Sequence, residues 1–296
     1  MSDLPTGPVP KVGAARHRRR RPVRAVLLVL VTAALVGGAA YGGAHLLSEG
    51  LGGSGASSGS ATSAAPDTGV LPGAPTPTPQ PAAAAATVRG VGYDVSYPQC
   101  RSTLPSSAAF GIVGLNGGAP LLSNRCFSEQ VAWARRTGAY AIYINTAYSG
   151  AGDPVAYGQR LAEDAITREH AAGVSGVRVW WLDVELTNSW KGTQRENATV
   201  IAAMAARLQS AGVRVGIYSS PDQWAEIAGD YSPGLPVWNA IGSGTEAQAL
   251  ASCDESFAGS VSAIVQWVAK RDGTLIDHNL VCPAYRHRAG EILVVR

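Results

Sequence analysis

Apolar residues between positions 88 and 283 fall into short runs that alternate with segments of helical periodicity. The runs are rich in β-branched and aromatic residues and end at Gly, Pro, Asn or Asp, which is typical of buried strands. We predict eight strands, at residues 92–97, 110–116, 140–147, 178–185, 214–219, 236–240, 263–268 and 275–279.

Helical patterns separate many of these strands, at residues 128–136, 154–172, 195–211 and 221–228. Asp153 has the character of an N-cap, with Pro154 as the first helical residue and Gly173 as the stop. Alternating strands and helices predict a largely parallel sheet under helical cover. Eight strands favour an irregular (β/α) barrel of the TIM-like type whose late helices are short or absent, and an open doubly wound sheet is the alternative.

The amino-terminal region predicts a membrane anchor. Residues 1–24 form a basic tail. Residues 25–47 are apolar except for His45, and this segment is long enough to cross a bilayer. Arginines precede the span, so we expect the tail in the cytoplasm and the remainder of the chain outside the cell membrane, as a single-pass protein. A signal peptide that is cleaved to release a secreted protein is the alternative.

A linker is predicted between the span and the folded domain. Residues 48–87 are rich in Gly, Ser, Ala, Thr and Pro, contain no aromatic residue and cannot form a core. The predicted domain covers residues 88–283 and is followed by a tail at residues 284–296. It is large enough to bury a sizeable core.

The distribution of charge argues against nucleic-acid binding. Residues 1–50 hold seven Lys or Arg against two acids, whereas the rest holds 17 basic and 19 acidic residues, a net charge of −2. The outer region therefore lacks the basic surface that nucleic acid requires.

All four cysteines follow the predicted span, which favours two disulfides in an exported domain. No CxxC pair is present, so we expect no zinc site. Three pairings are possible. We prefer Cys100–Cys126 and Cys253–Cys282, because each joins segments that are neighbours in the predicted strand order.

Two carboxylates at the end of an apolar strand, Asp183 and Glu185, are the strongest candidates for chemistry. Strand side chains alternate in direction, so the two point to the same face with α-carbons roughly 6.5 Å apart. Burial and mutual repulsion raise the pKa of at least one, as general acid–base catalysis requires. A structural pair held by Arg or backbone donors is the alternative.

Other polar and aromatic side chains lie near predicted strand ends. Asp94 stands in the first strand, Asp277 and Asn279 share a face of the last, and Asn116 and Asn145 end two others. Tyr97, Trp190 and Tyr218 also lie near strand ends, where flat rings can stack on sugar faces or pack in the core.

The chain resembles the glycoside hydrolase family 25 lysozymes, or a divergent group close to them. Its motifs recur in the family's order across the outer domain, as Gly92-Tyr93-Asp94-Val95-Ser96, Asp183-Val184-Glu185, Gly216-Ile217-Tyr218, Trp238-Asn239-Ala240, Gln266-Trp267 and Asp277-His278-Asn279. Two segments depart from it. The second strand ends Val113-Gly114-Leu115-Asn116-Gly117-Gly118 instead of in a Lys-Ala-Thr-Glu-Gly-like sequence, and Tyr143-Ile144-Asn145 replaces a Tyr-His-Phe.

The resemblance implies an irregular (β/α) barrel that cleaves the bond between N-acetylmuramic acid and N-acetylglucosamine in peptidoglycan. Glu185 would be the general acid, with Asp183, Asp94 and Asp277 completing an acidic pocket. Two carboxyl groups around the scissile bond are what glycoside hydrolysis needs. The expected substrate contacts are Tyr97, Asn116, Asn145, Trp190, Tyr218, Gln266 and Asn279.

The leading hypothesis is a membrane-anchored, monomeric hydrolase of bacterial cell-wall glycan that needs no cofactor or metal. A binding module that keeps the pocket without turnover is one alternative. A surface scaffold in which Asp183 and Glu185 are structural is another.

Overall fold

The computed structural model describes residues 86–271 and 273–296. The predicted basic tail, the predicted span at residues 25–47 and all but the last two residues of the predicted linker lie outside the described residues. Of the helices within the described ranges, none has the length and apolar character to cross a bilayer.

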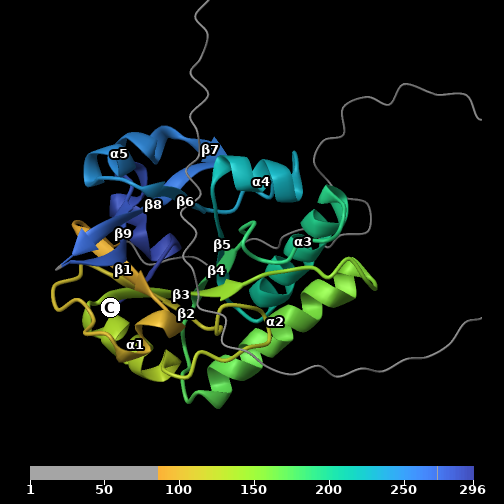
Figure 1. Cartoon of the computed structure of the whole chain (residues 1–296), viewed down its shortest axis with the longest axis horizontal. Helices are drawn as coiled ribbons and strands as arrows, with labels where there is room; N and C mark the ends of the chain where they lie inside the picture. Colours follow the sequence, from red (N-terminus) through yellow and green to blue (C-terminus); the bar gives the residue numbers. More distant parts are fainter. Residues whose placement is uncertain (1–85, 272) are drawn as a thin grey trace, which may run out of the picture. The chain divides into compact units, whose positions relative to one another are not determined.

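The described chain is an α/β barrel (Figure 1). Parallel neighbours run from β1 to β6 and on to β8, and the β8–β9 hairpin returns antiparallel to β1. The strands that form the barrel are β1 (Val91–Val95), β2 (Gly111–Gly114), β3 (Ala139–Asn145), β4 (Val179–Asp183), β5 (Arg214–Ser219), β6 (Val237–Ser243), β8 (Ser260–Arg271) and β9 (Thr274–Val281).

Pairing between β3 and β4 closes the ring, so the open doubly wound alternative is wrong and the barrel prediction is confirmed. Every predicted strand is present, with ends displaced by a few residues. The displacement matters at β4, which ends at Asp183 and leaves Glu185 in the loop that follows.

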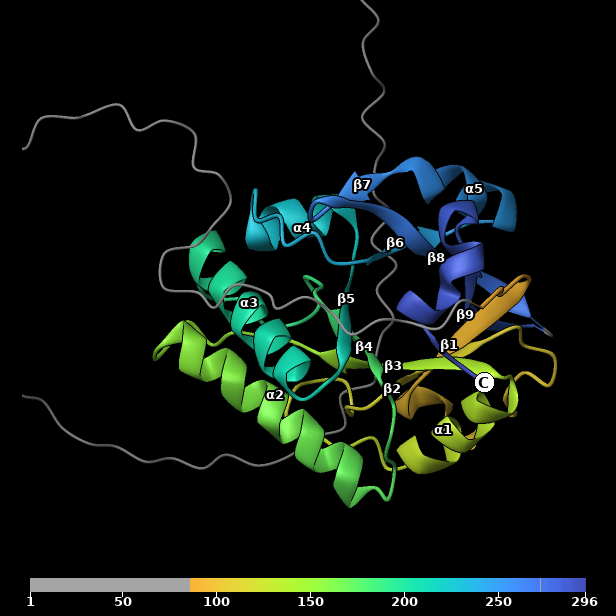
Figure 2. The ribbon, with the colours of Figure 1, turned by 180° about the vertical axis from the view of Figure 1, so that it is seen from behind.

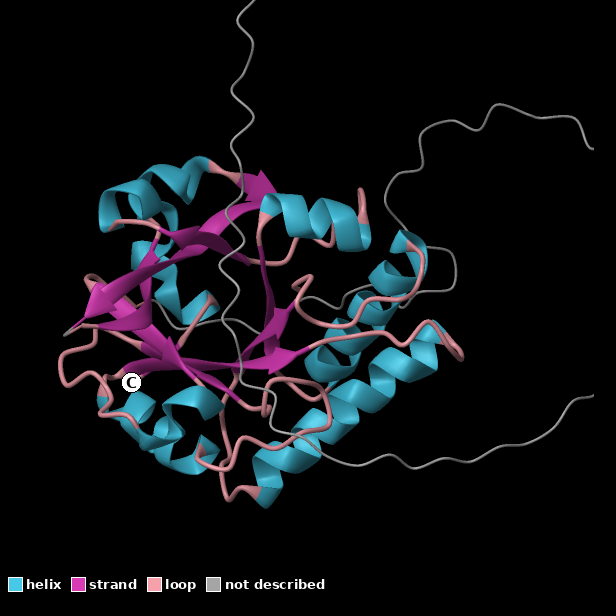
Figure 3. Cartoon of the chain, viewed as in Figure 1, coloured by secondary structure: helices cyan, strands magenta, loops and turns pink. Residues whose placement is uncertain are grey.

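Helices cover the first half of the barrel (Figure 3). They are α1 (Phe127–Arg136), α2 (Pro154–Ala171), α3 (Gln194–Ser210) and α4 (Pro221–Ala228). Helices α2 and α3 lie side by side in both views (Figures 1 and 2). Asp153 caps α2 by accepting from the backbone N–H of Ala156, and Gly173 follows that helix with φ of +67°, as predicted.

The second half has little helical cover, again as predicted. It contains the short α5 (Glu246–Ala251), the 3₁₀ turn η2 (Ser252–Asp254) and β7 (Ser256–Phe257), which pairs with β8. The β8–β9 hairpin then has no crossover helix, which explains why these two strands run antiparallel.

Alternation along the strands creates two apolar layers. On β4, Trp181 belongs to the cluster inside the barrel, whereas Trp180 and Leu182 belong to the cluster beneath the helices. All three are fully buried, so the strand carries apolar side chains on both faces. The inner cluster fills one part of the barrel and leaves polar side chains at the carboxyl ends of the parallel strands.

The carboxyl-terminal segment is part of the domain, which corrects the predicted tail at residues 284–296. The 3₁₀ segment η3 (Pro283–Glu291) is followed by β10 (Val294–Val295), which pairs with β3. Ile292 and Leu293 are fully buried in the inner cluster. On the amino-terminal side, Ala86, from the predicted linker, accepts from the backbone N–H of Ala289 at 3.1 Å.

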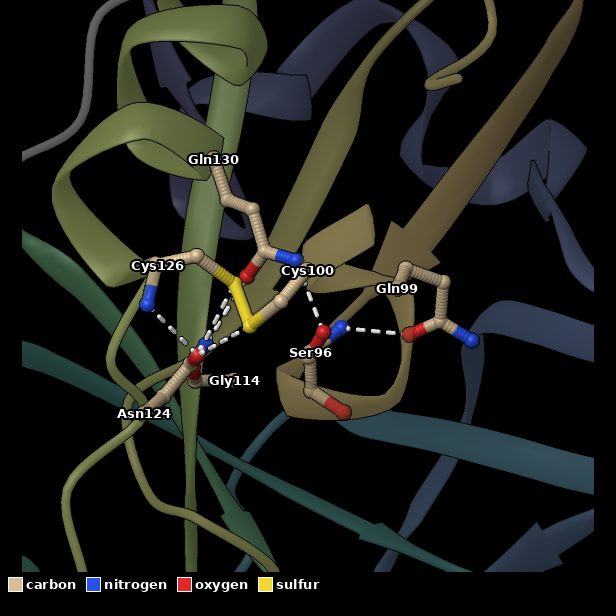
Figure 4. Close-up of a disulfide and its surroundings, with 7 residues drawn as sticks. All are labelled: Ser96, Gln99, Cys100, Gly114, Asn124, Cys126 and Gln130. Carbon is tan, nitrogen blue, oxygen red and sulfur yellow. Dashed lines mark hydrogen bonds between the residues drawn. A yellow bond between two sulfur atoms is a disulfide. The ribbon is translucent and has the colours of Figure 1, made fainter. Parts of the chain in front are cut away.

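Both disulfides have the pairing preferred from the sequence. Cys253 is joined to Cys282, linking η2 to the end of β9. Cys100 is joined to Cys126, linking the 3₁₀ turn η1 (Tyr97–Arg101) to the residue that precedes α1 (Figure 4). Such loops are worth about 3 to 4 kcal/mol each in the chain-entropy account.

Buried amides support the loops beside the first disulfide (Figure 4). Asn124 donates to Gly114 O and to Gln130 Oε1, each at 2.8 Å. Gln130 in turn donates to Ser96 O at 2.7 Å. These bonds hold the ends of β1 and β2 against α1, and β1 is the strand that carries Asp94.

Candidate active site

Four acids gather at the carboxyl ends of the parallel strands: Asp94, Asp183, Glu185 and Asp277. Strand register places Asp94 directly opposite Asp277 on the antiparallel β9. Electrostatic repulsion acts between Asp94 and Asp277, between Asp183 and Glu185, and between Asp277 and Glu185. The structure thus brings together the four acids that the sequence nominated.

Asp94 is held by two amides from the β8–β9 hairpin. Gln266 donates to its Oδ2 at 3.0 Å, and Asn279 donates to the same oxygen at 2.6 Å. Asn279 is itself oriented by Trp238, whose indole N–H donates to its Oδ1 at 2.8 Å. Asp94 is 5% exposed, so these amides replace the water that a carboxylate would otherwise bind.

Asp183 receives amide donors on both of its oxygens. Asn145, opposite it on β3, donates to Oδ2 at 2.5 Å, and Asn188 donates to Oδ1 at 3.3 Å. The backbone N–H of Asn145 donates to Asn116 Oδ1 at 2.9 Å. The predicted substrate contacts Asn116 and Asn145 therefore form a support for Asp183 in this structure.

Glu185 lies in the loop after β4 and is less buried than Asp183. Tyr218, Gln223 and Thr187 are its hydrogen-bonding neighbours. The Gln223 carbonyl accepts from Leu186 N at 2.7 Å, which turns the amide NH₂ of Gln223 toward Glu185. Neutral side chains therefore hold Glu185 at the rim of the candidate site.

The pKa values of all four acids are raised, and burial is the main cause for each. For Asp94 and Asp183 the rise is large, because neighbouring acids add to burial and the amide donors offset only part of it. The pKa of Glu185 rises by burial against the opposing hydrogen bonds. Burial, with the charge of Glu185, raises the pKa of Asp277 to about 6.

Within the described ranges, none of the four acids forms an ion pair with Lys, Arg or His. Buried carboxyls without a cation repel one another when they ionise, so such a group loses its protons at higher pH than free acids do and titrates as a unit. The alternative in which Arg holds Asp183 and Glu185 as a structural pair therefore finds no such partner among the described residues.

The predicted aromatic contacts have different surroundings. Tyr97 is 40% exposed, at the rim beside Gly118. Trp190 donates from its indole to Glu185 O at 3.1 Å and packs against the outer cluster, so it holds the loop that carries Glu185. Tyr218 is buried and donates to Gln266 Oε1 at 2.9 Å.

Sequence reasoning missed Asn188 and Gln223, which contact Asp183 and Glu185. Asn188 follows Asp183 by five residues, in an irregular loop with no recognisable pattern. Gln223 lies in the first turn of α4, after the next strand along the chain. Only the rule that successive loops meet at one edge of a parallel barrel could have indicated them.

A cleft of about 1000 Å³ lies elsewhere, beside α1, and is lined in part by Leu104, Trp133 and Arg136. None of the four acids lines it. The candidate site is therefore defined by its chemistry and not by the volume of this cleft. Among the described residues, no cluster of His, Cys, Asp and Glu has an arrangement that could hold a metal ion.

Carboxyls with raised pKa values at the carboxyl edge of an α/β barrel are the arrangement found in glycoside hydrolases. A family model described as lysozyme-like protein 1 matches residues 123–259. Two probable GH family 25 lysozymes of Dictyostelium discoideum, numbers 4 and 2, are each 37% identical to this chain, over 68 and 62 residues. These matches cover 22% and 20% of this chain and 32% and 29% of the two relatives, so they span about a third of the relatives' length.

Solved structures share the fold. A glycosyl hydrolase 25 of Streptococcus pneumoniae aligns with a TM-score of 0.50 at 17% identity, over 70% of this chain and 93% of its own. A muramidase from Acremonium alcalophilum aligns with a TM-score of 0.51 at 16% identity, over 69% and 99%. The resemblance to the glycoside hydrolase family 25 lysozymes is confirmed.

Proposed function

We propose that this protein hydrolyses a cell-wall glycan, and that its substrate is peptidoglycan. The observation that carries the proposal is the group of four carboxyls, buried without a cationic partner among the described residues. The similarity to proteins named lysozyme and muramidase supports this choice of substrate.

Glu185 is the proposed general acid. It is the most accessible of the acids on β4 and its loop, and burial raises its pKa, so it can carry a proton to a glycosidic oxygen. When Glu185 gives that proton to the leaving sugar, positive charge would develop on the other sugar ring.

Asp183, Asp94 and Asp277 are proposed to offset that positive charge. Asp183 and Asp94 are fixed by amide donors, so their positions are set before substrate binds. Fixed negative charge in a buried site stabilises a cationic transition state more strongly than charge in water does.

We also propose that residues 25–47 anchor the protein in the cell membrane and that the barrel lies outside it. The basic residues before the span and the two disulfides in the barrel support this topology. A barrel attached through residues 48–87 would reach the cell wall.

The test is to incubate the purified full chain with peptidoglycan, with chitin oligosaccharides and with an unrelated wall polysaccharide. The proposal predicts soluble fragments with new reducing ends from peptidoglycan. Binding to peptidoglycan without new reducing ends would instead support a binding module. If the protein neither binds nor cleaves any of these glycans, the four acids are structural residues.

A further inference from the structure

Arginines gather at the end of the barrel opposite the four acids. This end is formed by the amino ends of the parallel strands and by η3, which joins β9 to β10. We call it the basic face, and its residues are Arg135, Arg136, Arg178, Arg214, Arg286, Arg288 and Arg296. Four of them are exposed to solvent, namely Arg136, Arg178, Arg288 and Arg296.

Two of these arginines lie over one aromatic ring. The guanidinium carbons of Arg135 and Arg296 lie 5.7 Å and 5.8 Å from the centre of the Tyr140 ring. Arg135 also donates to Ser175 O at 2.6 Å. The backbone N–H of Arg296 donates to Gly138 O at 3.0 Å. The end of α1, the loop before β4 and the end of the chain therefore bring two like charges close together.

Arg178 and Arg214 extend the basic face along the next two strands. Arg178 precedes β4, and Arg214 is the first residue of β5. The backbone N–H of Arg214 donates to Arg178 O at 2.8 Å. Neither residue lies in a helix, so attraction to a helix dipole, which accounts for Arg135 and Arg136 in the last turn of α1, does not explain them.

Two acids at this end offset little of the charge. Glu291 pairs with Arg288 at 3.3 Å, and Glu169 is buried. Within the described ranges, the other three exposed arginines of the basic face form no ion pair with Asp or Glu. The basic face therefore presents an excess of positive charge to solvent.

The net charge of −2 predicted no basic surface in the outer region, and the structure corrects that prediction. The acids lie elsewhere: Asp153, Glu196 and Asp222 begin helices at the opposite end, beside the four acids of the candidate site. A sum over the sequence cannot show this separation, because it does not tell which end of the barrel each charge occupies.

The segment that precedes the barrel joins it at the basic face. Ala86 O accepts from the backbone N–H of Ala289, and the backbone N–H of Val88 donates to Arg286 O, each at 3.1 Å. Residues 48–85 separate this point from the proposed span. Even fully extended they cover no more than about 130 Å, so the barrel stays within reach of the membrane.

We propose that the basic face docks on anionic phospholipid headgroups of the membrane that holds residues 25–47. The inference rests on the anchor that is part of the proposed function. Guanidinium groups bind phosphate through paired N–H donors, and each Arg close to an anionic membrane strengthens binding about fivefold. In this orientation the four acids face away from the membrane, toward the glycan of the wall.

The test uses the full chain in lipid nanodiscs of phosphatidylcholine, with or without phosphatidylglycerol. Each arginine is reacted with phenylglyoxal, and its rate is read by mass spectrometry. Arg136, Arg178 and Arg296 should react at least about fivefold more slowly when phosphatidylglycerol is present. Arg125 and Arg195, exposed at the opposite end, should react at the same rate in both lipids. Equal rates at the basic face in both lipids would overturn the proposal.

A double variant tests which arginines are responsible. Arg136→Gln with Arg178→Gln should weaken docking about 25-fold, so that anionic lipid no longer slows the reaction of Arg296. The matched control is Arg125→Gln with Arg195→Gln, which removes the same charge at the opposite end and should leave the protection of Arg296 intact. Equal loss in the two double variants would assign the effect to net charge and contradict a docking face. All four side chains are exposed, so both proteins should fold.

A wall polymer is the other source of phosphate, and soluble poly(glycerol phosphate) without lipid forms a separate arm. Protection of the basic face by this polymer and none by phosphatidylglycerol would make the partner a wall polymer, and the proposal would be wrong.

Failure of docking and failure of the anchor are distinguishable. Insertion into nanodiscs of phosphatidylcholine alone tests the anchor, because it requires no lipid charge. A chain that inserts there, but whose basic face is not protected by anionic lipid, keeps the anchor and refutes the docking. A chain that does not insert, yet is protected by phosphatidylglycerol, loses the anchor and keeps the docking. Neither readout requires turnover of a glycan.

Discussion

Replacing Asp277 with Asn should make the barrel less sensitive to pH. The ordinary pKa of an Asp carboxyl is 3.8, and burial with the charge of Glu185 raises that of Asp277 to about 6. Between these values the folded protein holds a proton that the unfolded chain has released. Stability is therefore fully present below pH 3.8 and is lost as pH rises through 6.

The magnitude follows from the two pKa values. Their difference corresponds to about 3 kcal/mol of unfolding free energy lost by the native protein between roughly pH 4 and pH 8. The amide of the Asp277→Asn variant cannot ionise, so the variant does not lose this stability as pH rises. Relative to the native protein, its unfolding free energy should therefore increase by about 3 kcal/mol between roughly pH 4 and pH 8. For a domain of this size the gain is roughly 6 to 12 °C in Tm.

The assay is urea unfolding of both proteins at several pH values, with Asp230→Asn as the control. Asp230 is an exposed acid in the loop after α4, so this control removes one charge without touching the site. The stability difference between Asp277→Asn and the native protein should grow with pH, and that for the control should stay nearly constant. A difference that is the same at pH 4 and pH 8 would refute the reasoning.

Three further predictions concern the barrel and its location. Gly216→Ala should destabilise the protein by about 1 to 3 kcal/mol in urea unfolding, since a Cβ there would lie 2.3 Å from the Trp181 ring, and an unchanged midpoint would contradict this packing. Replacing Cys253 and Cys282 together with Ala should cost about 3.5 kcal/mol by the same measurement, whereas a loss under 1 kcal/mol would show that the bridge contributes little. Protease added to intact cells stripped of wall should remove the barrel if residues 25–47 anchor it outside, and full protection would contradict that topology.

Much of the barrel could be predicted from the sequence because its strands have strong local signals. Apolar β-branched runs bounded by Gly or polar residues indicated all eight barrel strands, and caps such as Asp153 indicated helix ends. The carboxyl-terminal segment was missed for a physical reason. Charged residues in η3 obscure the two apolar residues, Ile292 and Leu293, that enter the inner cluster.

The acids of the candidate site were predictable, whereas the residues that hold them were less so. Asp94, Asp183 and Asp277 lie on strands, where alternation and the common carboxyl edge place them together. The amides of Gln266 and Asn279 were also placed at this edge, but sequence periodicity cannot tell an amide that faces a carboxylate from one that faces a sugar. That distinction depends on which neighbour can only donate, as Trp238 does.

The most direct test of the account compares Glu185→Gln with the native protein on purified peptidoglycan. The matched control is Glu226→Gln, which makes the same change at an exposed position of α4. The account predicts that the native protein and the control release soluble fragments with new reducing ends at equal rates. It predicts a rate at least about 100-fold lower for Glu185→Gln, with binding to peptidoglycan retained. Equal rates of release by Glu185→Gln and the native protein would contradict the assignment of Glu185 as the general acid.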